Sequence, residues 1–151
     1  DVERSRGLGD VYKRQVYTLA PRARVLCMAQ SADDLLVQTA AVLASGGTAL
    51  WPSAHAGLRA KLPTHVQAQV ILQDNALSDG TVALDAVLHH GDAASLQTVC
   101  TTLARRPGPI VGVTALQPGA TNIPLERLLI ERALSVNTAA AGGNASLMTI
   151  G

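Results

Sequence analysis

Arg24-Val-Leu-Cys-Met-Ala-Gln-Ser-Ala-Asp-Asp34 is the stretch that decides the fold, because a buried strand runs into a helix start within it. Residues 24–29 form a short apolar run bounded by charged and polar residues, which is typical of a strand buried on both faces. Ser31 is a preferred N-cap residue, and Asp34 places a carboxylate at the third helical position, as in a capping box. The segment therefore predicts a strand followed directly by a helix.

The helix that begins after Ser31 has an apolar face and a defined end. Gly46 and Gly47 stand where a helix commonly ends with a C-cap glycine. Residues 48–51 are then predicted as the next strand, which Pro52 ends. The residues expected on the buried face of the helix follow helical spacing and are Leu35, Leu36, Thr39, Val42 and Leu43.

The alternation of strand and helix continues toward the C-terminus. A strand is predicted at residues 84–89, followed by a helix capped by Asp92. Residues 110–113 indicate another buried strand, and residues 124–131 a last helix. Residues 75–81 are predicted as a loop. The second helix is expected to bury Leu96, Val99, Cys100 and Leu103.

The segment between residues 53 and 73 does not indicate one structure. Residues 53–62 are compatible with a helix or an irregular connection, and residues 66–72 with a helix end or a strand. Elsewhere, strands that alternate with helices at this spacing predict βαβ units with right-handed crossovers. We therefore expect residues 16–131 to form an α/β, Rossmann-like three-layer domain with a mainly parallel sheet.

Residues 132–151 have a different character, since no charged residue follows Arg132. Val136, Leu147 and Ile150 favour extended structure, and glycine and asparagine at residues 142–144 tolerate the positive φ of a tight turn. The tail is therefore predicted to be a strand-turn-strand ribbon. An uncharged ribbon of this kind is expected to need a partner surface, because free tails are usually polar and solvated.

The first fifteen residues are excluded from the fold prediction. Residues 5–15 resemble a translated transposon adapter from sequencing-library preparation, whose end reads Asp-Val-Tyr-Lys-Arg-Gln, as residues 10–15 do. A natural basic arm is the alternative. If the adapter interpretation is correct, the natural chain begins upstream of Val16 and the protein is a fragment.

Composition argues against several classes of function. Four of the 12 basic and three of the 11 acidic residues lie in residues 1–15, which leaves eight of each in the remainder. This neutral remainder has no basic patch, which argues against nucleic-acid binding by this domain. No apolar run reaches the roughly 20 residues of a membrane span, so a cytoplasmic location is expected.

For each candidate cofactor, metal or nucleophilic site, a structural role explains the residues better than a chemical role does. The turn at residues 29–34 has no glycine for a pyrophosphate and carries two carboxylates, so a capped structural helix is favoured over dinucleotide binding. Cys27 and Cys100 have no Cys-x-x-Cys spacing, so both are expected to be small buried hydrophobes rather than zinc ligands, a redox pair or a nucleophile. No metal and no catalytic residue is therefore predicted in this chain.

The histidines do not form a convincing constellation. His89 and His90 are adjacent at the carboxyl end of a predicted strand, where neighbours point to opposite faces, so they cannot easily bind one metal ion. His55 and His65 lie in the uncertain segment. Ordinary polar loop positions are favoured over a metal or catalytic role, and Asp92 is explained as an N-cap.

The sequence resembles the proline utilization A (PutA) family, bacterial enzymes that fuse proline dehydrogenase to L-glutamate gamma-semialdehyde dehydrogenase. The resemblance covers residues 16–151 and is most specific in the uninterrupted run from Ser135 to Gly151. The other stretches that resemble long members of the family are Val16-Tyr-Thr-Leu-Ala-Pro-Arg-Ala-Arg-Val-Leu-Cys27, Ala40-Ala-Val-Leu-Ala-Ser-Gly46, Leu50-Trp-Pro52 and Leu125-Glu-Arg-Leu-Leu-Ile-Glu-Arg132.

The resemblance implies a role without chemistry of its own. It implies an aldehyde dehydrogenase superfamily-like domain that acts as a lid over the tunnel through which the intermediate passes between the two active sites. The parent enzyme is implied to use FAD and NAD, and this domain is implied to bind neither cofactor. The implied partner is the dehydrogenase domain of the same chain; a homo-oligomeric parent with peripheral membrane contact is also implied. The expected interdomain contacts are Val136, Asn137, Thr138, Gly142, Gly143, Asn144 and Leu147. The alternative is a stand-alone interaction module or a dinucleotide-binding Rossmann-like module.

Overall fold

The computed structural model describes residues 13–137, which form two compact units. The larger one, Ala20–Ile130, is called the sheet unit here. The smaller one combines the segments that flank it and contains most of a two-stranded sheet, called the ribbon, made by β1 (Lys13–Pro21) and β7 (Leu129–Asn137). Residues 1–12 and 138–151 lie outside the description.

The sheet unit contains a five-stranded sheet in the order β4-β3-β2-β5-β6, and all neighbours in it are parallel. The first strand of the unit is central, the next two extend the sheet to one side and the last two to the other, which is the strand order of a doubly wound sheet. The fold is therefore mixed α/β and compatible with the Rossmann-like class predicted from the sequence. The strands are β2 (Arg24–Met28), β3 (Thr48–Trp51), β4 (Val70–Leu72), β5 (Ala86–His90) and β6 (Gly112–Leu116).

The stretch that was expected to decide the fold forms the predicted strand and helix. β2 leads into α1 (Ala32–Ala44), and the Ser31 hydroxyl accepts a hydrogen bond from the Asp34 backbone N–H at 3.1 Å. The helix ends at Ser45, and Gly46 follows it with a φ of 88°. This left-handed conformation is accessible to glycine at little cost, so the predicted C-cap is confirmed.

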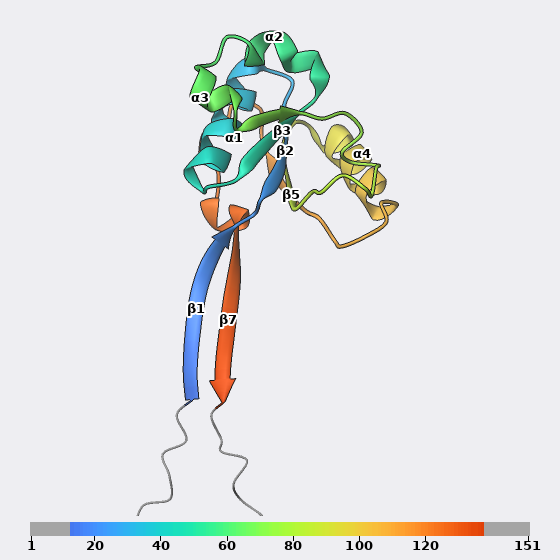
Figure 1. The fold of residues 1–151 in the computed structure, drawn as a ribbon. Helices are drawn as coiled ribbons and strands as arrows, with labels where there is room; N and C mark the ends of the chain where they lie inside the picture. Colours follow the sequence, from blue (N-terminus) through green and yellow to red (C-terminus); the bar gives the residue numbers. More distant parts are fainter. Residues whose placement is uncertain (1–12, 138–151) are drawn as a thin grey trace, which may run out of the picture. The chain divides into compact units, whose positions relative to one another are not determined.

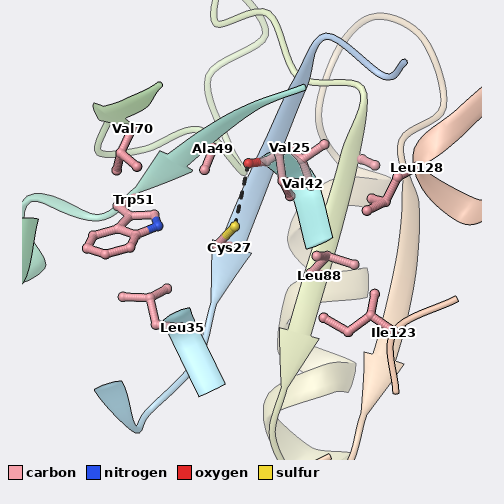
Figure 2. Close-up of a cluster of buried hydrophobic side chains, with 11 residues drawn as sticks. Val25, Cys27, Leu35, Val42, Ala49, Trp51, Val70, Leu88, Ile123 and Leu128 are labelled. Carbon is pink, nitrogen blue, oxygen red and sulfur yellow. Dashed lines mark hydrogen bonds between the residues drawn. The ribbon is translucent and has the colours of Figure 1, made fainter. Parts of the chain in front are cut away.

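Helices cover both faces of the sheet, as Figure 1 shows for α1 and α4 (Ala93–Ala104). Alternate residues of each strand point to opposite faces. On the α1 face, Val25 and Cys27 of β2 pack with Trp51 in one buried cluster (Figure 2). On the α4 face, Leu26 packs in a second cluster with Leu50 and neighbours from β5 and α4. The two clusters account for the predicted three layers.

The segment that sequence reasoning left open contains short elements of both kinds. It comprises η1 (Ser53–His55), α2 (Ala56–Arg59), α3 (Thr64–Gln67) and then β4. The Asp74 carboxylate accepts from the Ser53 backbone N–H at 2.9 Å and so joins the two ends of this segment. Residues 66–72 are thus both a helix end and a strand, because β4 adds three residues in parallel to β3.

Several local predictions were wrong. The strand predicted at residues 110–113 is β6, shifted to Gly112–Leu116, and it lies at the edge of the sheet with Ile110 fully exposed. The last helix predicted at residues 124–131 is only η2 (Leu125–Leu128), after which the chain enters β7. Two positions placed on buried helix faces, Leu36 and Cys100, are exposed.

The ribbon differs from the predicted strand-turn-strand tail in its partner. β7 contains Val136 and Asn137, but it pairs with β1 from the beginning of the chain, and the two strands run in opposite directions (Figure 1). β1 begins at Lys13, so it includes the last three residues of the segment that resembles an adapter. The rest of the predicted tail lies outside the described residues.

Candidate functional site

The ribbon is the first candidate site, because it contains the described part of the predicted contact region. The Thr18 hydroxyl donates to the Arg132 carbonyl at 3.5 Å, a side-chain link between the two strands. Large apolar side chains on both strands are exposed: Leu19 is 68% and Leu134 61% accessible. Among residues 13–137, β1 and β7 pair only with each other.

The seven predicted contact residues are only partly described. Val136 and Asn137 lie in β7, near its end. Thr138, Gly142, Gly143, Asn144 and Leu147 lie outside the described residues, and their role as contacts stays a prediction.

The second candidate site is the carboxyl edge of the parallel sheet. The chain leaves β2 toward α1 on one face and leaves β5 toward α4 on the other, so the carboxyl ends of these neighbouring strands form a topological switch point. Ligands of doubly wound proteins bind in the crevice at such a point. A cavity of about 180 Å³ lies there, lined by Met28, Ala29, Gln30, Pro52, His89, His90 and Ser95.

His90 points to the α1 face and is part of a buried polar network. Its Nδ1 lies 2.8 Å from Gln38 Nε2, which also donates to the Met28 carbonyl at 2.9 Å, and its Nε2 lies 2.8 Å from the Ala120 carbonyl. A carbonyl only accepts, so Nε2 carries the proton and Nδ1 accepts from Gln38. The network therefore joins β2, α1, β5 and the turn after β6.

His89 points to the opposite face, as predicted for neighbours on a strand. Its side chain is only 4% exposed, and its Nδ1 is buried without a hydrogen-bond partner among the described residues. Burial lowers the pKa of His89, an effect that the nearby Asp92 carboxylate opposes. Both histidines end a buried strand, so the interpretation as ordinary loop residues was wrong.

The amino terminus of α1 is occupied by the protein itself. The buried Asp34 carboxylate accepts from the Gly119 backbone N–H at 3.0 Å, and Gly119 has a φ of 81°. The same turn provides the carbonyl of Ala120 to His90. The position at which a phosphate would bind to the N-terminus of α1 thus carries a negative charge that already has a backbone partner.

The two cysteines have different environments. Burial raises the pKa of the Cys27 thiol to about 12, so this thiol is protonated at neutral pH and is a poor nucleophile. Cys100 is exposed on α4, which corrects the expectation that both cysteines are buried. Within residues 13–137, no three histidine, cysteine or acidic side chains lie close enough together to hold a metal ion. No described helix is long and apolar enough to cross a membrane.

Sequence reasoning missed the residues that organise the carboxyl edge. Gln38 is fully buried on α1, between Leu35 and Val42 on the same face. A polar residue at a buried helical position was the available signal, because such a group needs an internal hydrogen-bond partner. The pairing of Asp34 with Gly119 had no sequence signal, since the two residues are 85 positions apart.

Comparison with known proteins shows relatives of much greater length. The bifunctional protein PutA of Salmonella typhimurium is 52% identical over 147 residues, which covers 95% of this chain and 11% of that protein. The bifunctional protein PutA of Escherichia coli is 50% identical over the same coverage, and that of Rhizobium meliloti is 39% identical over 151 residues, or 12% of its length. The chain thus spans about a tenth of these curated relatives, and no protein-family model matches it.

Proposed function

We propose that this chain, which belongs to the PutA family, is a non-catalytic piece of a bifunctional enzyme that oxidises proline to glutamate. In the parent protein an FAD-dependent proline dehydrogenase and an NAD-dependent L-glutamate gamma-semialdehyde dehydrogenase act in sequence. This piece serves as a lid over the path of the intermediate and supports the dehydrogenase through its ribbon and C-terminal residues. It binds neither FAD nor NAD itself.

The observation that carries the proposal is the match to the bifunctional relatives. Identity of 50–52% extends over 95% of this chain, yet the match covers only 11% of each relative. A segment of that size in a much longer multidomain protein has its partners in the same chain. The dehydrogenase domain of the parent is therefore the proposed partner.

The ribbon supports an interaction role. A two-stranded sheet alone is at best marginally stable in water, and this one exposes Leu19 and Leu134. Strand addition to one of its open edges would satisfy unpaired backbone groups and cover apolar side chains. Val136 and Asn137 lie in β7, and the other predicted contacts follow them in the sequence.

The chemistry of the sheet unit supports the non-catalytic part of the proposal. An aldehyde dehydrogenase needs a thiolate nucleophile and a bound nicotinamide cofactor. Cys27 is buried with a raised pKa, and the N-terminus of α1 is occupied by the Asp34–Gly119 interaction. In this proposal the domain acts by excluding water and closing a cavity rather than by forming or breaking bonds.

Deletion of residues 135–151 from the intact parent enzyme tests the proposal. We expect lower NAD-dependent oxidation of the semialdehyde, because the dehydrogenase domain loses a supporting strand, and largely unchanged proline oxidation. Unchanged dehydrogenase activity in a folded deletion variant would contradict the proposal.

A point variant separates loss of contact from loss of folding. Leu134→Asp changes an exposed ribbon residue, and Ile110→Asp changes an exposed residue of the sheet unit as its matched control. We expect only Leu134→Asp to lower dehydrogenase activity in the intact enzyme. Equal losses in both variants would contradict a specific role for the ribbon.

A further inference from the structure

The switch-point cavity has features of a ligand site that are independent of the role of the chain in a larger enzyme. It lies between the carboxyl ends of β2 and β5, beside the amino terminus of the 12-residue helix α4. Met28, Pro52 and Ala29 give it apolar walls, while Gln30, Ser95 and His89 bring polar groups to it. A mostly apolar cavity with a few convergent polar groups is the usual composition of a small-molecule site.

His89 is the group that points to a ligand. Its side chain is 96% removed from solvent, given its exposure of 4%, and its Nδ1 is buried without a hydrogen-bond partner among the described residues. Buried polar groups normally have a partner, and leaving one without a partner costs free energy. His90, its neighbour, also lines the cavity, but both of its ring nitrogens have partners, so only His89 keeps a ring nitrogen without one.

Gly91 keeps His89 and Ser95 close to one point. A Cβ atom on Gly91 would stand 2.9 Å from His89 Nε2 and 2.6 Å from Ser95 Oγ, with His89 Cε1 at 2.5 Å. A side chain at position 91 would therefore displace the ring of His89, the hydroxyl of Ser95 or both from this point. The Ser95 hydroxyl donates to the Asp92 carbonyl at 3.0 Å, which leaves its lone pairs to accept a hydrogen bond from a ligand.

Charge and size limit what can bind. The Asp92 carboxylate caps α4 by accepting from the Ser95 backbone N–H at 2.8 Å, and it opposes the binding of an anion at this helix terminus. Burial favours the neutral form of His89, whose ring then has one donor and one acceptor nitrogen. A volume of about 180 Å³ lies below the roughly 300–1,000 Å³ of common ligand pockets, so a small molecule fits this cavity better than a dinucleotide.

We propose that this cavity binds a small uncharged molecule that carries both an N–H donor and a hydrogen-bond acceptor, namely an amide or an azole. The ligand N–H donates to Ser95 Oγ, and the second polar atom of the ligand pairs with the ring of His89. Met28 and Pro52 contact its apolar side.

Titration of the histidine-labelled 151-residue chain with acetamide and with pyrazole, followed by NMR, tests the proposal. We expect a saturable shift of the His89 ring signals and none at His65, which is exposed. Ser95→Ala removes one acceptor but keeps the Asp92 cap, so it should weaken binding about tenfold, the effect of one lost hydrogen bond. Acetate has the size of acetamide with a negative charge and should bind much more weakly.

Matched glycine variants test the geometry. Gly91→Ala should abolish the shift, whereas Gly57→Ala, at which an added Cβ meets no atom within 4 Å, should leave it unchanged. The proposal is overturned if His89 shows no saturable shift, if His65 shifts in parallel with it, or if acetate binds as tightly as acetamide. An unchanged affinity in Ser95→Ala overturns it as well, even if Gly91→Ala does not fold.

Discussion

The sheet unit and the ribbon differ in how many strands pair and in how far their apolar side chains are buried. The five strands of the sheet unit pair in one parallel sheet, and side chains such as Trp51 and Leu50 are completely buried on its two faces. The ribbon has two strands, and Leu19 and Leu134 are mostly exposed. The difference indicates that the sheet unit is stabilised by its own buried residues, whereas the described part of the ribbon leaves large apolar side chains exposed, which is the basis for the proposed partner.

Replacing Trp51 should have the largest effect on the sheet unit. Its side chain is 0% exposed, packs against Leu35 and Val70 in the α1-face cluster (Figure 2), and donates from Nε1 to Thr39 Oγ1 at 2.9 Å. Trp51→Ala should lower the free energy of unfolding by about 3–5 kcal/mol, because it leaves a large cavity. Urea unfolding followed by circular dichroism measures the change. Ile110→Ala, at a fully exposed position, is the control, and a similar loss in both would refute the assigned core.

Replacing Gln38 should have the second largest effect. Gln38→Ala leaves the Met28 carbonyl and His90 Nδ1 without their partner in a buried region. Each such loss costs about 1–3 kcal/mol, so unfolding in urea should be easier by at least about 1 kcal/mol. Gln97→Ala, on an exposed position of α4, provides the matched control. If the two glutamine variants are equally stable, the polar network does not stabilise the carboxyl edge.

Sequence reasoning predicted the parts of this comparison that depend on local signals. The strand at Arg24, the Ser31 cap and the glycine after α1 are each encoded within a few residues, and all are confirmed. The parallel sheet followed from the alternation of strands and helices. These features needed no knowledge of distant contacts.

The wrong predictions share a dependence on distant contacts. Ile110 and Cys100 have the hydrophobic character of buried residues, but β6 is an edge strand and no further described layer covers them. Residues 124–131 have the composition of a helix, yet β7 begins at Leu129 because its partner is β1, more than 100 positions earlier. The buried position of Gln38 likewise depends on His90, 52 positions away.

The pH dependence of stability should reveal the burial of His89. The folded-state pKa of His89 is lowered from 6.5, mainly by burial, so the unfolded chain binds more protons in the range just below pH 6.5. The stability contributed by neutral His89 is therefore full above pH 6.5 and is lost as the pH falls toward the lower folded-state pKa. His89→Gln should flatten this part of the stability curve, measured by thermal unfolding at several pH values.

Two comparisons check this assignment. The pKa of Asp92 is lowered from 3.8 by its hydrogen bonds to Ser95, so the stability that this carboxylate contributes is lost only as the pH falls below 3.8. Gln97→Ala, at an exposed position of α4 without a titratable group, should leave the curve unchanged. If Gln97→Ala and His89→Gln alter the curve equally, burial of His89 is not the cause.

The smallest effect on stability is expected in the ribbon. Leu134→Ala changes a side chain that is 61% exposed, so the 151-residue chain should lose no more than about 0.5 kcal/mol, as for other surface substitutions. Leu128→Ala is the same substitution six positions earlier at a completely buried site, and it should cost about 2–5 kcal/mol. In the intact parent enzyme the Leu134 variant should instead lower dehydrogenase activity, because there the side chain is proposed to be covered. Equal destabilisation by the two variants in this chain would mean that the ribbon belongs to the core, and its exposed leucines would then require no partner.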